Sequence, residues 1–235
     1  MTVFLFGLDG ASEEQIRSVM QRTNLPNFEK VFKKGIISDL LSVYPYVTAP
    51  AWTTIFSGVN PGKHGIFEMY KIVGNKLRPQ NMRDTDVPFL WDYLSWAGKR
   101  TLALGIPFIY PAPTINGVFV TGRFVPKLSS YPGVVKDQFD LSGFEYVELP
   151  TEQGIENVIS RGPKETSEKA LEGLKLRIKG SLALIDSEKW DIVILVDNLP
   201  DEVFHISYDD PHIVGRMFSR IDDFLGKVFE RLDKD

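Results

Sequence analysis

Two stretches of the sequence are apolar throughout and are each followed by an aspartate, and they constrain the fold more than any other feature. Residues 3–8 form one such run, which is followed by Asp9, and residues 192–196 form the other, which is followed by Asp197. A strand that is apolar on both faces is typical of a parallel sheet covered by helices on both sides. Open α/β sheets bind their ligands at the carboxyl ends of such strands, which makes Asp9 a candidate site residue.

Helical patterns alternate with these strands and indicate the fold class. The order predicts an α/β protein with a doubly wound, mainly parallel sheet. A length of 235 residues suits one domain over 1–235, with residues 122–165 as a small cap or insert. We expect strands at 101–106, 117–121 and, more weakly, 36–43; helices at 28–34, 49–57, 87–97, 167–187 and 214–232; a loop at 60–65; and an irregular excursion at 68–87.

The composition excludes several classes of function. The net charge is −4 and there is no basic cluster, which argues against a nucleic-acid partner. The absence of cysteine excludes disulfides, thiolate metal sites and cysteine nucleophiles. We recognise neither a secretory signal nor an apolar stretch of membrane-spanning length, so we expect a cytoplasmic protein without a membrane partner. With only three histidines, a metal site must rely on carboxylates.

Thr48 precedes a short helical pattern that Gly58 closes. Threonine is a good N-cap, and Pro50 is tolerated in a first helical turn, so the Thr48 hydroxyl is expected at a helix N-terminus. Free N–H groups and the helix dipole there attract a phosphoryl group and help to activate a hydroxyl. The alternative is a plain capping threonine ahead of a buried helix.

A second candidate cluster follows the strand at 192–196. If this stretch is helical, Asp201 and His205 lie on one face and can hold one cation, for which Zn²⁺, Mn²⁺ or Fe²⁺ is better suited than Ca²⁺. The alternative is that Asp201 caps the turn and His205 packs on the surface. Asp9 has a similar alternative as the cap of the helix after it. His64, flanked by glycine, is interpreted as a side chain that braces its loop.

Seven short segments together carry a resemblance to a known family. The chain resembles the alkaline phosphatase superfamily, and within it the type I phosphodiesterase/nucleotide pyrophosphatase-like branch of phosphohydrolases and phosphomutases. The segments at 47–53 and 58–66 are specific when taken together. The matching stretches are GLDG at 7–10, NLPN at 24–27, VTAPAWT at 47–53, Gly58 with NPGKHGI at 60–66, LW at 90–91 with AGK at 97–99, IP at 106–107 with YP at 110–111, and residues 201–205.

The resemblance implies a two-metal phosphoesterase with two divalent ions, zinc or alternatively manganese or iron. Asp9 would bind one metal, and Thr48 would bind the same metal and attack phosphorus to give a phospho-threonine intermediate. Asp201 and His205 would bind the second metal, which activates the hydrolytic water. Two such metals would stabilise both the attacking and the leaving oxygens of an in-line displacement.

Two departures from the family pattern bear on this expectation. Related nucleotide pyrophosphatases have an asparagine three residues after the nucleophile, whereas this chain has Ala51, which puts a nucleotide substrate in doubt. The family also continues into a strand that ends in Asp-His-Gly and later supplies another metal-binding histidine, so the fold is expected to be C-terminally truncated. His212 is not an obvious substitute for the missing ligands.

Three explanations remain open: a fragment with a weak or dead site, a partner chain that supplies the missing ligands, or a degenerate relative that binds without turnover. An exposed sheet edge would favour self-association, so a homo-oligomer is a further expectation. The leading hypothesis is metal-dependent hydrolysis of phosphate mono- or diesters, with a small phosphorylated substrate. The rivals are a non-catalytic binding or assembly module and a metal-dependent phosphomutase. A sulfatase is disfavoured because the run from Thr48 to Trp52 lacks the required nucleophile and arginine.

Overall fold

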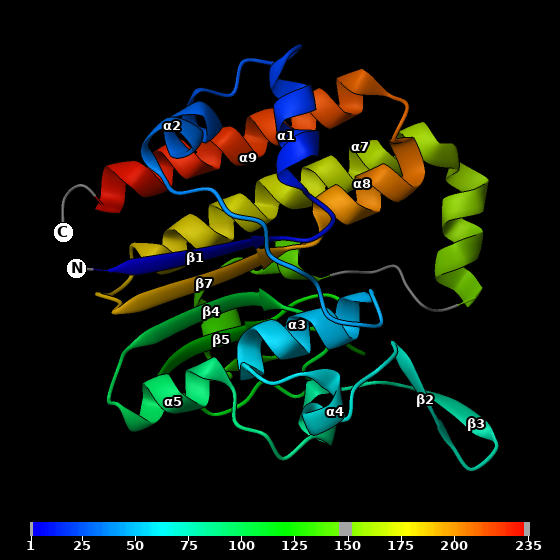
Figure 1. Ribbon diagram of the computed structural model, residues 1–235, viewed down its shortest axis with the longest axis vertical. Coiled ribbons are helices and arrows are strands. Elements are labelled where there is room, and N and C mark those ends of the chain that lie inside the picture. The colour runs from blue at the N-terminus through cyan, green and yellow to red at the C-terminus, as the bar shows by residue number, and fades with distance from the viewer. Residues whose placement is uncertain (1, 146–151, 233–235) are drawn as a thin grey trace.

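A five-stranded sheet forms the centre of the computed structural model, which describes residues 2–145 and 152–232 (Figure 1). The strands are β1 Val3–Leu8, β4 Thr101–Ile106, β5 Gly117–Thr121, β6 Ser130–Tyr131 and β7 Ile192–Asp197. They lie in the order β1-β7-β4-β5-β6, in which the first four are parallel and β6 is antiparallel to β5. The predicted α/β class with a mainly parallel sheet is therefore confirmed.

Helices cover both faces of this sheet. They are α1 Glu13–Met20, α2 Pro26–Lys34, α3 Thr48–Ser57, α4 Pro61–His64, α5 Leu90–Trp96, α7 Glu152–Ile185, α8 Leu199–Ser207 and α9 Pro211–Leu232. One face carries α1, α2, α7, α8 and α9, and the other carries α3, α4 and α5 (Figure 1). Successive side chains of β1 point to opposite faces of the sheet, because a strand is pleated. Phe6 packs on Phe224 of α9, whereas Leu5 joins the opposite cluster around Trp52.

The helices and strands with the strongest sequence patterns lie where they are predicted. The strands expected at 101–106 and 117–121 are β4 and β5, and the helix expected at 214–232 lies within α9. The helix expected at 167–187 is the second part of α7, which is interrupted at Gly162, where φ is 76°, just before Pro163. A proline removes a backbone donor and fixes φ, which explains why the long helix breaks at this point.

Two predictions of irregular structure are wrong. The expected loop at 60–65 contains the short helix α4, which begins at Pro61 because proline is well tolerated as the first helical residue. The expected excursion at 68–87 contains an antiparallel hairpin of β2 Tyr70–Val73 and β3 Lys76–Pro79, followed by the turn η1 Met82–Asp84. The hairpin is separate from the main sheet.

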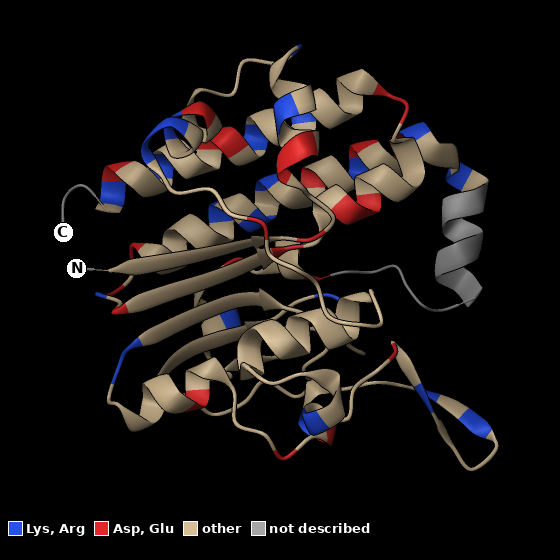
Figure 2. Cartoon of the chain, in the orientation of Figure 1, with Lys and Arg blue, Asp and Glu red and all other residues tan. Residues whose placement is uncertain are grey.

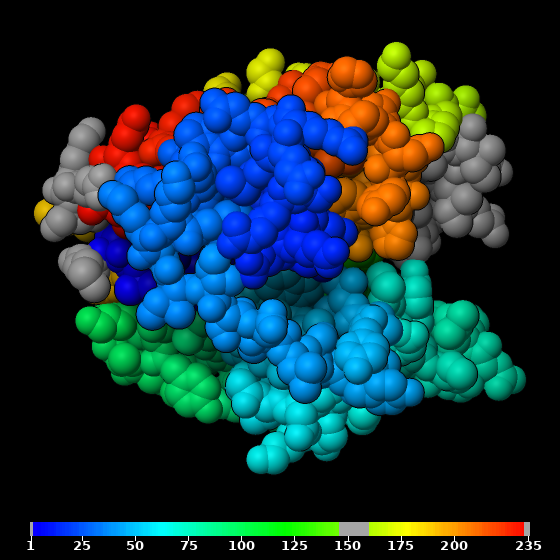
Figure 3. All heavy atoms as spheres, turned by 45° about the horizontal axis from the view of Figure 1, so that its top comes forward, coloured from blue at the N-terminus to red at the C-terminus, as the bar shows by residue number. Residues whose placement is uncertain are grey.

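The weak strand expected at 36–43 is also wrong. This segment joins α2 to α3 and runs over the surface, where its light-blue colour is visible in Figure 3. Ile36, Leu40 and Leu41 are 99%, 86% and 94% exposed. A strand needs a neighbouring edge to satisfy its backbone, and this segment pairs with no other strand in the described part of the chain.

The cap or insert predicted at 122–165 stays a prediction, because its residues 146–151 lie outside the described residues. Its described part includes β6, the short helix α6 Val135–Gln138 and the turn η2 Ser142–Phe144. None of the helices that the structure describes combines the length and the apolarity needed to cross a membrane. The expected cytoplasmic location stays a prediction.

A buried carboxylate on α9 caps the start of α2. Leu25, which precedes α2, has no side chain that can cap the helix. Asp222 is 2% exposed and accepts the backbone N–H groups of Asn27 at 3.0 Å and Phe28 at 2.8 Å. The side-chain amide of Asn27 donates to the same carboxylate at 2.9 Å. This contact fastens α2 to α9 across 195 residues of sequence.

Replacing Asp222 with alanine should lower the free energy of unfolding by about 2–3 kcal/mol, because it leaves several buried donors without an acceptor. Urea denaturation measures the change. The matched control is Asp223→Ala at the exposed neighbouring position, which should change the free energy of unfolding by less than about 0.5 kcal/mol. Equal stability of Asp222→Ala and the wild type would contradict the capping role.

Candidate active site

The carboxyl ends of β1 and β7 lie side by side and bring three polar residues together. The parallel register pairs Leu8 with Asp197, and the Asp9 N–H donates to the Asp197 carbonyl at 3.0 Å. The side-chain amide of Asn198 donates to the Asp9 carboxylate at 2.6 Å. Figure 2 shows acidic residues in the chain just after these two strands. This is the edge at which open α/β sheets bind their ligands.

Asp9 does not cap the helix that follows it. Ser12 does so, since its hydroxyl accepts the Gln15 N–H while the Gln15 side chain accepts the Ser12 N–H. The alternative interpretation of Asp9 as a capping residue is therefore wrong. The main chain of Asp9 instead contacts α8, because its carbonyl accepts the Asp201 N–H at 3.0 Å.

The pKa of the Asp9 carboxyl is raised above its ordinary value of 3.8. Burial is the largest cause, and the negative charge of Asp201 adds to it. Side-chain hydrogen bonds from Asn198 and Trp52 oppose the shift without cancelling it. Two carboxyl groups that repel each other at a strand end favour a proton or a cation between them.

Gly10 allows α8 to approach this closely. Its φ of 69° is in the left-handed region, and a Cβ atom at this position would lie 2.6 Å from the Cα of Asp201. Any other residue would therefore push Asp201 away from Asp9. Glycine after Asp9 is therefore required by the close packing of α8, whatever the chemical role of Asp9.

The condition that Asp201 and His205 lie in one helix is met, because both belong to α8. The His205 Nε2 atom lies 3.4 Å from a carboxylate oxygen of Asp201, one helical turn away. The His205 side chain is 78% exposed and that of Asp201 is 32% exposed, so a cation could reach both from solvent. Carboxylate and imidazole are suitable donors for zinc, but a catalytic zinc site has three protein ligands. Residues 2–145 and 152–232 contain no group of three or more side chains that could hold a metal ion.

Thr48 is the first residue of α3, and the predicted N-cap role belongs to Val47. The Val47 carbonyl accepts the Ala51 N–H at 3.1 Å, which closes the first helical turn one residue earlier than expected. Because Thr48 makes no capping bond, its half-buried hydroxyl keeps its hydrogen-bonding capacity for another group. Trp52 lies one turn further on and packs against Gly7, where a Cβ atom would lie 2.4 Å from the indole ring. Thr48 and Trp52 share a helix face, so α3 is seated beside the end of β1.

His64 has the bracing role that its glycine neighbours suggested. Its Nδ1 atom accepts the Ile66 N–H at 3.1 Å, and its Nε2 atom lies 3.0 Å from the Thr54 hydroxyl. Burial lowers the pKa of this imidazole, which favours the neutral form that these bonds require. His64 therefore joins the α4 turn to α3.

Sequence reasoning missed the residues that support the predicted ligands. Asn198 was not singled out, although it directly follows a strand and an aspartate. Arg123, two residues after the end of β5, forms an ion pair with Glu202 in the first turn of α8 at 2.5 Å. Arg177 of α7 forms a buried pair with Asp197. No sequence signal identifies these pairs, because their members are 79 and 20 residues apart.

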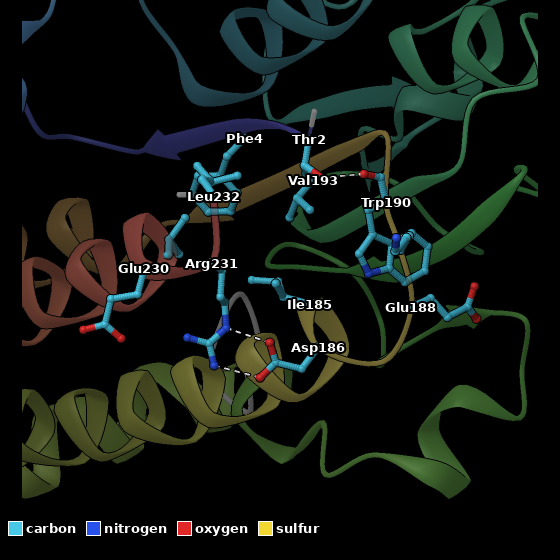
Figure 4. Close-up of a pocket in the computed structure, with 12 residues that line it drawn as sticks. Thr2, Phe4, Ile185, Asp186, Glu188, Trp190, Val193, Glu230, Arg231 and Leu232 are labelled. Carbon is cyan, nitrogen blue, oxygen red and sulfur yellow. Dashed lines mark hydrogen bonds and ion pairs between the residues drawn. The ribbon is translucent and has the colours of Figure 1, made fainter. Parts of the chain in front are cut away.

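A cavity of about 500 Å³ lies at the opposite end of the sheet and is not part of this site (Figure 4). Its lining includes Thr2, Trp190 and the paired Asp186 and Arg231, near the amino ends of β1 and β7. The Thr2 hydroxyl donates to the Trp190 carbonyl at 2.7 Å. The candidate residues Asp9 and Asp201 instead lie at the carboxyl ends.

Comparison with known proteins bears on the family of the chain and not on its individual site residues. The profile of the family described as "Type I phosphodiesterase / nucleotide pyrophosphatase" matches residues 3–235. Ectonucleotide pyrophosphatase/phosphodiesterase family member 3 of Bos taurus is 35% identical over 137 residues, which are 57% of this chain and 14% of that protein. Among solved structures, phosphonoacetate hydrolase from Sinorhizobium meliloti 1021 in complex with phosphonoformate has a TM-score of 0.65 at 14% identity, over 98% of this chain and 53% of the other. Murine ectonucleotide pyrophosphatase/phosphodiesterase 5 has a TM-score of 0.57 at 16% identity, over 100% of this chain and 53% of the other.

The chain shares its fold with these two solved structures. It belongs to the type I phosphodiesterase/nucleotide pyrophosphatase family. It spans about half the length of the solved relatives, 53% in each of the two above, and 14% of the curated relative. The roles assigned to Asp9, Thr48, Asp201 and His205 stay predictions.

Replacing Asp9 with asparagine should raise the free energy of unfolding at pH 7. The raised pKa means that the folded protein binds a proton which the unfolded chain releases just above pH 3.8, so the contribution of Asp9 to stability falls as the pH rises. Asparagine removes this charge and keeps an oxygen that can accept the Asn198 amide.

Urea midpoints from pH 4 to pH 7 test this prediction. The difference between Asp9→Asn and the wild type should grow with pH, whereas Asp39→Asn, at an exposed position, should leave the midpoint unchanged. A lower midpoint for Asp9→Asn than for the wild type at pH 7 would show that the carboxylate is not under electrostatic strain.

Proposed function

We propose that this chain forms part of a metal-dependent enzyme that hydrolyses phosphate mono- or diesters, with Thr48 as the nucleophile. The observation that carries the proposal is the hydrogen-bonded junction of Asp9, Asn198 and Asp201 at the carboxyl edge of the sheet. Helix α3 is seated beside this junction through Trp52 and begins at Thr48. Family membership supports the class of reaction.

The carboxylate, imidazole and hydroxyl groups of the site are suitable donors for divalent metal ions, but there are too few of them to complete the coordination of an ion. Asp201 and His205 would hold one ion, and Asp9 and Thr48 would hold another. Zn²⁺ is our first choice, with Mn²⁺ or Fe²⁺ as alternatives. Such ions would supply charge for the attacking and leaving oxygens of the phosphoryl group. The exposed position of His205 leaves room for a further ligand.

The residues of this chain would bind and orient the substrate. The Thr48 and Ala49 N–H groups lie in the first turn of α3, where a helix leaves its donors free for an anion. A phosphoryl group bound there would lie next to the Thr48 hydroxyl. The Asn198 amide holds the Asp9 carboxylate in one orientation. The substrate would be a small phosphorylated molecule. Attack of the Thr48 oxygen on phosphorus would break the ester P–O bond, release the alcohol and give a phospho-threonine intermediate, which water would then hydrolyse.

We further propose that a partner completes the site, either a second copy of this chain or another chain. The described residues supply two close ligands at α8, and a working metal site needs more. In the described part of the sheet β1 pairs with β7 alone, so its other edge is open to an added strand. Asp9 lies at the end of that edge strand.

A second candidate is a non-catalytic module that binds a metal or a phosphate compound on the same fold. The lack of a third ligand among the described residues counts against catalysis, because a two-ligand site holds a cation in no fixed geometry and so cannot position the reacting groups. Turnover separates the two candidates.

The test is hydrolysis of an activated aryl phosphodiester with added Zn²⁺ or Mn²⁺. Thr48→Ala should lower the turnover rate by about 10³-fold or more, because it removes the nucleophile. Thr48→Ser is the matched control: it keeps a hydroxyl and should retain measurable turnover. Full activity of Thr48→Ala would refute the mechanism. Absence of turnover in the wild type, with either metal and at all protein concentrations, would favour the binding module.

A further inference from the structure

The first turn of α8 has each of its backbone donors assigned to a partner. A helix leaves its first N–H groups without partners inside the helix. In α8 the Leu199 N–H donates to the Asp197 carboxylate at 2.9 Å, and the Asp201 N–H donates to the Asp9 carbonyl at 3.0 Å. Pro200, between them, has no N–H to satisfy. Asp197 therefore caps the helix, and this leaves the Asn198 side chain free to bind Asp9.

Asp197 can serve as this cap because a buried arginine holds it. The Arg177 guanidinium donates to both carboxylate oxygens, with Nε at 3.0 Å from one and Nη2 at 3.1 Å from the other. Both side chains are almost fully buried, at 6% and 5% exposed. The Nη1 group of Arg177 also donates to the Gly143 carbonyl at 3.1 Å. A guanidinium makes such paired bonds in one fixed geometry, which an ammonium cannot reproduce.

We propose that Arg177 is a positioning residue which, through Asp197, sets the start of α8 and so fixes Asp201 and His205 relative to Asp9. Arg177 touches none of the candidate ligands itself. The chain of contacts runs from the guanidinium to the Asp197 carboxylate, to the Leu199 N–H and into the helix. The expected effect on metal binding rests on the proposed function, whereas the expected effect on the position of α8 does not.

The double variant Arg177→Met/Asp197→Asn tests the proposal. Arg177→Met alone would leave a buried carboxylate unpaired and could unfold the protein for that reason alone. In the double variant, the asparagine that replaces Asp197 has no charge, and its oxygen can still accept the Leu199 N–H, while the link to α7 is lost. The matched control is Leu184→Ala, a fully buried residue of α7 in a different part of the core. Leu184→Ala lowers stability without touching α8.

Amide hydrogen exchange gives the structural readout. In the double variant, the Leu199 and Asp201 amides should exchange at least 10-fold faster relative to the β4 amides, which report global opening. In Leu184→Ala, the amides of α8 and β4 should change together. The proposal would be overturned if the exchange rates of the α8 amides changed by the same factor as those of the β4 amides in both variants.

Paramagnetic broadening of the α8 resonances by Mn²⁺ gives the functional readout and works for weak binding. The apparent dissociation constant should rise about 10-fold in the double variant, as is typical when the support of a metal ligand is removed. It should change less than 2-fold in Leu184→Ala. Unchanged Mn²⁺ binding in Asp201→Asn would refute the ligand assignment of the proposed function, while the exchange result would still decide the role of Arg177.

Discussion

The hydrogen bonds between the ends of β1 and β7 hold the candidate site together. The Asp9 main chain bonds to Asp197 on one side and to Asp201 on the other, and its carboxylate accepts the Asn198 amide. Through these bonds, residues separated by about 190 positions share one strand edge. Asp201 and His205 of α8 depend on this junction for their position, since α8 begins only one residue after β7 ends.

The same junction is electrostatically unfavourable, which is typical of functional sites. Burial and the neighbouring Asp201 raise the pKa of Asp9, so the charged form is less stable here than in water. An asparagine at position 9 could accept the Asn198 amide without placing a negative charge in this buried position. Proteins keep such groups where a cation, a proton or a substrate offsets the repulsion. The metal-binding role of Asp9 stays a prediction, and its position at the carboxyl edge is compatible with it.

The sequence predicted those parts of the fold that local patterns determine. The apolar runs of β1 and β7 and the long amphipathic helices have strong periodicity, and they lie where it places them. The segment at 36–43 failed because a strand depends on a neighbour that no local pattern reveals. The N-cap of α3 was wrong by one residue, which is the ordinary uncertainty of a helix end.

In the candidate site, too, only the residues with a local sequence signal could be predicted. The i, i+4 spacing singled out Asp201 and His205 as candidates, and the strand end singled out Asp9, because these signals are local. Asn198, Arg123 and Arg177 went unnoticed, since each acts on a residue that is distant in sequence or lies next to a stronger signal. Family membership supports the chemistry but not the individual roles, because the chain spans about half of its solved relatives.

The central claim is that a divalent metal binds at the carboxyl edge between α8 and Asp9. A crystal structure of the protein grown with Zn²⁺, with anomalous data collected at the zinc edge, tests it most directly. We predict an anomalous peak bonded to Asp201 and His205 at about 2.0–2.2 Å, on the side of α8 that faces Asp9. Zinc bound elsewhere on the chain, with no peak at this pair, would contradict the account.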